Sequence, residues 1–218
     1  MKNKTPEVWV VWPTISPVKS LPMVDKWHEL GYKVAILVNP PNRNDQLFSA
    51  ERVVVQNKWK GFPVAANILC KIVPGDIVVV VGDDVYPDPN RTAEEIGVEF
   101  LKRFPDTYGV MQPIGDKFAW THKCAVSPWI GRTFIERAYQ GRGPFWEGYY
   151  HYFSDQELQE YATSLGIFQQ REDLTQFHDH WQRKENPQRP PHLMEAKKKW
   201  RKDRHTFQIR KGKGWPND

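Results

Sequence analysis

The sequence predicts an α/β fold: a doubly wound, mainly parallel sheet flanked by helices. Through the first half of the chain, strand-like apolar segments alternate with segments of helical periodicity, the order typical of parallel sheets with helical crossovers. The run at 77–81 consists of apolar β-branched residues, which fits a strand buried on both faces. With 218 residues, the chain is long enough to bury a core without metal or disulfide crosslinks.

Most of the sheet is expected from the first 81 residues. A loop with two prolines follows the first strand at 13–17, and Gly31 is a natural stop for the helix before the second. The expected strands are 8–12, 32–38, 52–55 and 77–81, and the expected helices between them are 21–30 and 64–72.

The second half of the chain is expected to add further strands and helices. Thr92 and Glu95 have the spacing of a capping box, which predicts a helix over 92–104. Strands are expected at 110–113 and 118–126, and helices at 127–140 and 154–165, the last ended by Gly166.

Composition excludes several classes of protein and site. The two cysteines, Cys70 and Cys124, lack CxxC spacing, which argues against a disulfide framework and a thiolate zinc site. No apolar run approaches the roughly 20 residues that span a bilayer, and neither a P-loop nor a dinucleotide-binding glycine motif is present. We expect a soluble, cytoplasmic protein with no transmembrane segment.

Positive charge is concentrated at the end of the chain. The formal net charge is +5, and residues 189–218 hold ten Lys or Arg against three acidic residues. The stretch 197–204 combines such cations with Trp200, a combination that can grip phosphates and stack a base. A solvated helix, a disordered end or contact with an anionic membrane surface are the alternatives.

The strand at 77–81 ends in Gly82, Asp83 and Asp84. The carboxyl end of such a strand is the usual ligand crevice of an α/β sheet, and Gly82 and Pro87 favour a turn that lets the two carboxylates converge. A divalent cation is the ligand that paired carboxylates suggest, and a solvated Asp-Asp turn is the alternative.

Residues before and after this strand form a pattern with a recognisable order and spacing. They are Asn57, Gly61, Ala65, Ala66, Asn67, Gly75, Asp76, Ile77 and the run Gly82-Asp83-Asp84-Val85 with Pro87. This pattern resembles the nucleotide-sugar half of family 2 glycosyltransferases over roughly residues 8–182. The resemblance implies a GT-A fold, in which an Asp-x-Asp motif holds Mn²⁺ or Mg²⁺ against a nucleoside diphosphate-sugar.

The resemblance also implies a division of the chain and a donor site. A GT-A-like catalytic domain would span 1–186, with a nucleotide-sugar half at 1–90 and an acceptor half at 91–186, followed by a basic tail at 187–218. Gly82 takes the first Asp position of the motif, which leaves Asp84 as the expected metal ligand. The other expected donor-site residues are Pro13, Thr14 and Ile15 at the base, Asn39 reading uracil, Lys58 near the diphosphate, and Asp83.

His178 and His180 occupy the place of a late histidine that, in the resembling family, closes onto the metal or diphosphate. Two histidines at i and i+2 point the same way on a strand, and His180 is the favoured ligand of the two. An exposed polar turn or packed histidines are the alternatives.

Residues 145–158 resemble the acceptor segment of the family, in which an acidic residue at a helix start serves as the base. Asp155 occupies that position, and Glu147 is the second candidate. Such a carboxylate takes the proton of the attacking acceptor hydroxyl. The plain alternative is that Ser154 or Asp155 caps a helix.

The combined expectation is a metal-dependent, inverting glycosyltransferase that uses a nucleotide-sugar such as a UDP-hexose. The basic tail favours a nucleic acid acceptor, for example DNA with hydroxymethylated bases, while a glycan, lipid or protein acceptor stays open. A noncatalytic nucleic-acid-binding protein, in which the Asp-Asp turn is structural, is the alternative from a different class.

Overall fold

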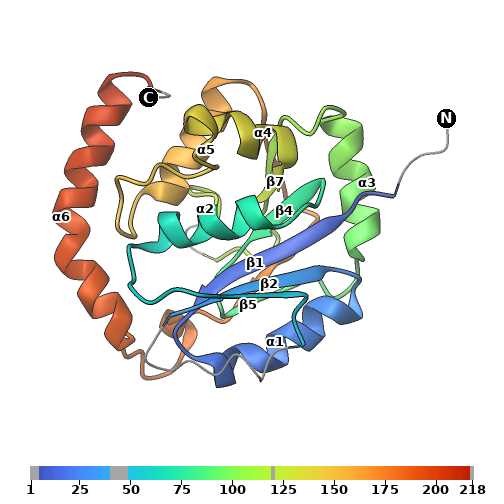
Figure 1. Ribbon diagram of the computed structural model, residues 1–218, viewed down its shortest axis with the longest axis horizontal. Coiled ribbons are helices and arrows are strands. Elements are labelled where there is room, and N and C mark those ends of the chain that lie inside the picture. Colours follow the sequence, from blue (N-terminus) through green and yellow to red (C-terminus); the bar gives the residue numbers. More distant parts are fainter. Residues whose placement is uncertain (1–4, 40–48, 119–120, 217–218) are drawn as a thin grey trace.

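The computed structural model describes residues 5–39, 49–118 and 121–216. Its centre is a seven-stranded sheet in the order β3-β2-β1-β4-β7-β6-β8, and a two-stranded sheet pairs β5 with β9. Helices cover both faces of the large sheet (Figure 1). The strands are β1 Val8–Thr14, β2 Lys33–Val38, β3 Arg52–Val55, β4 Ile77–Val80, β5 Val85–Tyr86, β6 Val110–Pro113, β7 Trp129–Gly131, β8 Phe168–Arg171 and β9 Phe177–His178.

The pairing confirms the expected mainly parallel sheet. Strand β1 lies parallel to both β2 and β4, and β2 lies parallel to β3. Strand β7 runs antiparallel to β4 and β6, while β6 and β8 are parallel. The carboxyl ends of β1 to β4 therefore meet along one edge of the sheet.

The helices are α1 Pro17–Glu29, α2 Phe62–Ile72, α3 Ala93–Arg103, α4 Arg132–Arg137, α5 Ser154–Ser164 and α6 Pro191–Gly212, with short 3-10 helices at Ala138–Gly141 and Trp181–Arg183. The capping box at the start of α3 is confirmed, because Thr92 accepts from the Glu95 N–H and Glu95 accepts from the Thr92 N–H. Within the described residues, no helix combines the length and apolar character needed to cross a membrane.

Two apolar layers form because successive residues of a strand point to opposite faces. On β4, Val78 and Val80 pack with α2, α4 and α5, while Ile77 and Val79 pack with α1 and α3. All four side chains are buried, as expected for a strand covered on both faces.

In the second half, the expected strand at 118–126 is wrong and the expected helix at 127–140 begins only at Arg132. Residues 121–124 form turns rather than a strand, and 119–120 of that expected strand lie outside the described residues. The expected helix at 127–140 is cut short because Trp129 and Ile130 insert as β7 between β4 and β6. Both side chains are fully buried there, so strand pairing prevails over helical periodicity in this part of the chain.

Candidate functional site

The carboxyl edge of the sheet brings the expected donor-site residues together. Thr14 ends β1, and its hydroxyl donates to Asp83 Oδ2 at 2.8 Å. The same hydroxyl oxygen accepts from the Ser16 N–H at 3.0 Å. The end of β1, the loop after it and the turn after β4 are thereby fixed to one another.

Asn39 extends this edge from β2 to β3. Its backbone N–H donates to the Thr14 carbonyl at 3.0 Å, and its side-chain amide donates to the Gln56 carbonyl at 3.1 Å. Pro13 and Ile15 flank Thr14 and are partly exposed, and Lys58 follows β3 with an exposed side chain. Pro13 and Thr14 are the last residues of β1, and the other residues expected at the nucleotide follow the ends of β1 to β4.

The small sheet brings the candidate metal ligands to the same place. Strand β5 pairs antiparallel with β9, with Val85 opposite His178. The Asp179 N–H donates to the Asp84 carbonyl at 2.8 Å, and His178 Nε2 lies 3.2 Å from Asp84 Oδ1. Asp84 and His178, far apart in sequence, are thus neighbours at the end of β4.

His180 lies beside this pair but outside the strand: β9 ends at His178, and His180 caps the short helix that follows. The expectation that both histidines lie on one strand is therefore wrong. The ring centroid of His180 is 4.9 Å from that of His178 and 5.1 Å from that of Phe118. Burial, aided by His178, lowers the pKa of His180 to about 4, so its imidazole is neutral near pH 7. Its Nδ1 accepts from the Gln182 N–H at 3.3 Å, which leaves Nε2 as the nitrogen outside that bond.

The side chains present fit a divalent cation in part. One carboxylate and one imidazole converge, and Mg²⁺ and Mn²⁺ sites commonly take one or two protein ligands and fill the rest with substrate phosphates and water. Among the described residues, no three His, Cys, Asp or Glu side chains are grouped as a complete metal site. An ion held by Asp84 and His178 would therefore need ligands from the substrate.

Strand β9 is supported from the side by Asp116 and Arg183. Asp116 Oδ2 accepts from the His178 N–H at 3.2 Å and also from Arg183 Nη2. The Arg183 guanidinium lies 4.5 Å from the ring centroid of Phe118 and 5.0 Å from that of Phe177. The backbone that carries His178 is thus held by a carboxylate and a guanidinium stacked between two rings.

Gly82, at the first Asp position of the motif, has a steric role. A Cβ placed on this residue would lie 2.8 Å from Asp84 Oδ1, so the glycine leaves room for that carboxylate to turn back beside the strand end. Asp88 does not replace the missing acid, because its two oxygens accept from the backbone N–H groups of Asn90 at 2.9 Å and Thr175 at 2.7 Å.

Glu147 lies at the start of the acceptor segment with an exposed side chain. Its Oε1 accepts from the Asn67 side-chain amide at 3.1 Å. The same Asn67 amide donates to the Phe145 carbonyl at 2.8 Å, and its oxygen accepts from the Phe145 N–H at 3.1 Å. Asn67, one of the residues behind the resemblance, therefore joins α2 to the acceptor segment.

Asp155 lies in the first turn of α5. Its Oδ1 accepts from the Gln156 N–H at 2.9 Å, and burial raises the pKa of its carboxyl above the ordinary range. The helix is capped by Phe153, in the left-handed region with φ 69°, without a side-chain cap. Neither Ser154 nor Asp155 is thus the N-cap that the plain alternative supposes.

A second carboxylate of this helix was not foreseen as important. Glu157 is fully buried and accepts from the hydroxyls of Tyr139 at 2.8 Å and Tyr149 at 2.6 Å. It also accepts from Arg210 Nε and Nη2 at 2.9 to 3.0 Å. The sequence gives little indication of this cluster. Glu157 lies two residues after Asp155, but its partner Arg210 comes from α6, whose composition is typical of a solvated tail.

The architecture is that of GT-A-type glycosyltransferases. No protein-family model matches the chain, and no curated protein matches its sequence. Solved structures do share the fold, although the sequence identities are low.

One of these structures is the mannosyltransferase PcManGT from Pyrobaculum calidifontis in complex with GDP-Man and Mn²⁺. It matches with a TM-score of 0.60 and 18% identity over 82% of this chain and 58% of that chain. S. aureus TarS 1–349 in complex with UDP matches with a TM-score of 0.59 and 12% identity over 78% of this chain and 59% of that chain. The present chain thus spans less than two thirds of the length of either protein.

Proposed function

We propose that this protein transfers a sugar from a nucleotide-sugar to an acceptor hydroxyl, with inversion at the anomeric carbon and with help from Mn²⁺ or Mg²⁺. The observation that carries the proposal is the convergence of Asp84 and His178 at the carboxyl edge of the sheet, 3.2 Å apart. That edge is where ligands bind in open α/β sheets, and the fold shared with PcManGT and TarS supports the same placement.

The donor half would bind the nucleotide along the ends of β1 to β4. Thr14 and Asn39, already joined by a backbone hydrogen bond, would present the edge that meets the base and ribose. Asp84 and His178 would hold the divalent ion, with His180 beside them. When bound, the ion would act as a Lewis acid that neutralises the charge on the leaving diphosphate. We propose a UDP-sugar as the donor, and a GDP-sugar is the alternative suggested by PcManGT.

The acceptor half would supply the base. Asp155 would accept the proton of the acceptor hydroxyl as that oxygen attacks the anomeric carbon from the side opposite the diphosphate. Burial raises the pKa of this carboxyl, which makes the carboxylate a stronger base than an exposed aspartate. Glu147, exposed and bonded to Asn67, is the second candidate.

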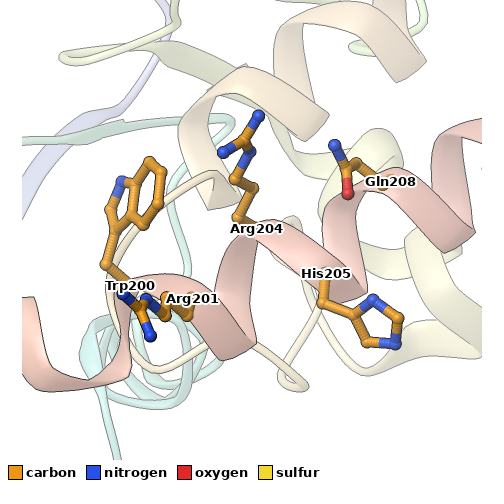
Figure 2. A pocket seen from close by; sticks show the side chains of 5 residues that line it. All are labelled: Trp200, Arg201, Arg204, His205 and Gln208. Atoms are coloured by element: carbon orange, nitrogen blue, oxygen red, sulfur yellow. The ribbon is translucent and has the colours of Figure 1, made fainter.

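A flank of α6 is our candidate for acceptor binding. An open depression there is lined by Trp200, Arg201, Arg204, His205 and Gln208, whose side chains extend from successive turns of the helix (Figure 2). The Arg204 guanidinium lies 5.2 Å from the Trp200 ring centroid. Clustered cations beside an aromatic ring suit a phosphate backbone and a stacked base, so we propose a nucleic acid acceptor, such as DNA with hydroxymethylated bases.

Binding of nucleotides tests the donor site. UDP and GDP are titrated by calorimetry into the wild type and the Asp84→Ala variant, with Mn²⁺, with Mg²⁺ and with a chelator. We expect nucleotide binding to depend on the ion and to be lost in Asp84→Ala. The proposed site has only two protein ligands, so removal of its one carboxylate should abolish binding of the ion. Binding of equal strength in the chelator would overturn the proposed metal site.

Turnover tests the reaction and the acceptor. A panel of UDP- and GDP-sugars with Mn²⁺ is assayed for hydrolysis and for transfer to DNA with and without hydroxymethylated cytosine. We expect Asp155→Ala to bind UDP as the wild type does and to lose transfer. Transfer to a glycan, lipid or protein in place of DNA would correct the acceptor alone.

A noncatalytic nucleic-acid-binding protein is the second candidate, favoured by the exposed cations of α6. It predicts salt-sensitive DNA binding that Asp84→Ala leaves unchanged, with no turnover of any nucleotide-sugar. Turnover of a nucleotide-sugar is therefore the measurement that separates the two functions.

A further inference from the structure

Helix α6 is attached to the domain through a stripe of buried side chains. Ala196, Asp203, Phe207 and Arg210 are 3%, 0%, 7% and 6% exposed, and their spacing puts them on one face of the helix. In Figure 1 the helix runs along one side of the molecule and ends near α5. Two of the four attached residues are charged, which is unusual for a face that only packs.

Asp203 places its carboxylate on three successive backbone N–H groups. Oδ1 accepts from Tyr150, and Oδ2 accepts from His151 and Tyr152, each at 3.0 Å. Successive N–H groups that converge in a turn form an anion-binding concavity. Bonds to a charged acceptor are stronger than neutral ones, and they satisfy N–H groups that no helix or strand satisfies here.

The same turn is also bonded to the start of α2. The Phe62 N–H donates to the Tyr150 carbonyl at 2.8 Å. Gly61 has φ +112°, and a Cβ on it would lie 2.6 Å from that carbonyl oxygen. The start of α2 and the middle of α6 thus both hold residue 150.

The turn leads directly into the candidate base. Phe153, next in the chain, adopts φ 69° and caps α5, whose second residue is Asp155. The Phe153 ring packs against Phe207 and Trp200 of α6, with centroid distances of 5.1 and 6.0 Å. The backbone from 150 to 153 is therefore set by α6 immediately before it delivers Asp155.

We propose that Asp203 is a positioning residue of the reaction: it orders the turn at 150–152 from α6 and so fixes the place of Asp155 relative to the donor. The inference rests on the proposed function, in which Asp155 is the base. It gives α6 a positioning role in the reaction, separate from any acceptor binding at the depression on its flank. A small displacement of a catalytic group can lower a rate by about 100-fold, so the position of this turn matters even though Asp203 does not touch the substrate.

The test compares Asp203→Asn, Asp203→Glu and Ala196→Gly with the wild type. Asn removes the charge and one acceptor oxygen, whereas Glu keeps both oxygens on a longer side chain. Ala196→Gly is the matched control, because it weakens the same helix by about 1 kcal/mol without removing an acceptor from the turn. The readouts are UDP affinity in Mn²⁺, the kcat and donor KM of the donor that turns over, and amide hydrogen exchange at 150–152.

We expect Asp203→Asn to lower kcat by roughly 10- to 100-fold, with UDP affinity and donor KM within about twofold. Exchange at 150–152 should speed up in this variant only, and Asp203→Glu should restore part of kcat. If Asp203→Asn does not fold, the Asp203→Glu variant is compared with Ala196→Gly instead. A lower kcat in Asp203→Glu, with UDP affinity retained, supports the same inference.

Three results would overturn the inference. The first is an Asp203→Asn variant that loses amide protection and keeps kcat, because the turn would then be irrelevant to the base. The second is a parallel loss of UDP affinity, kcat and stability in Asp203→Asn and Ala196→Gly, which is the mark of a structural role. The third is a wild-type protein whose amides at 150–152 are protected from exchange but which turns over no nucleotide-sugar. That result would also overturn the proposed function. The first two results leave the proposed function intact.

Discussion

Replacing Arg210 with Met tests whether the buried ion pair with Glu157 holds α6 to the domain. Arg210 and Glu157 are 6% and 0% exposed. The guanidinium donates to both Glu157 oxygens at 2.9 to 3.0 Å and to the Pro216 carbonyl at 2.7 Å. It also lies 3.8 Å from the Trp146 ring centroid. Methionine keeps much of the side-chain volume and removes all of these polar contacts.

The expected loss of stability is about 3 to 5 kcal/mol, the usual effect of removing one partner of a buried pair. Two tyrosine hydroxyls still donate to Glu157 after the substitution, so the loss from the ion pair itself should be near the lower end of this range. The lost cation–π contact adds about 1 kcal/mol. A domain is stable by only about 5 to 15 kcal/mol. For a chain of this size the melting temperature should fall by roughly 6 to 20 °C.

Urea denaturation measures the effect, with Lys211→Met as the control. Lys211 is the next residue, and its ammonium lies 2.7 Å from Glu160 in a pair whose side chains are 55% and 26% exposed; its loss should cost under about 1 kcal/mol. Arg210→Met combined with Glu157→Gln should be more stable than Arg210→Met alone, because no unpaired charge stays buried. An Arg210→Met loss below about 1 kcal/mol would show that the pair does not hold the helix.

Three further substitutions test the site. Gly61→Ala should lower stability by about 1 to 3 kcal/mol in thermal unfolding, because φ is +112° and the new Cβ would lie 2.6 Å from the Tyr150 carbonyl oxygen. Gly82→Ala should weaken Mn²⁺-dependent UDP binding by roughly tenfold in calorimetry, because its Cβ would lie 2.8 Å from Asp84 Oδ1; unchanged affinity would contradict the role assigned to that carboxylate. Asp155→Asn should be more stable than the wild type at pH 7. Burial raises the pKa of the Asp155 carboxyl in the folded protein above its value in the unfolded chain. The wild type therefore loses stability as the pH rises from the unfolded pKa of this carboxyl through its folded pKa. In urea the advantage should shrink toward about pH 4, and a constant difference would refute this reasoning.

The donor edge could be predicted because local signals and topology agree there. The buried run at 77–81 ends in Gly82, Asp83 and Asp84, and parallel strands place such ends along one edge. The structure accordingly joins Asp83 to Thr14. The meeting of Asp84 with His178 rested on the resemblance alone, because nothing in the sequence around 178 indicates pairing with a strand some 90 residues earlier.

The inner face of α6 could not be predicted for a different reason. Asp203 and Arg210 occupy positions of its buried stripe, so the periodicity of apolar residues is interrupted where the helix is most firmly attached. Their partners are the backbone at 150–152 and the carboxylate of Glu157, about 50 residues away. A charged residue in a helix reads as solvated unless its distant partner is known.

Two of the residues that carry the resemblance have a physical role: they join α2 to the segment at 145–150. The Asn67 side chain bonds to both the backbone N–H and the backbone carbonyl of Phe145. Gly61 leaves room for the Tyr150 carbonyl. Both lie at or near the start of α2, yet both contact residues 145–150. Asp203 then holds the same segment from α6. A turn restrained from two sides is preorganised rather than adaptable, which is what a base requires if it must meet an acceptor hydroxyl in line with a bound donor.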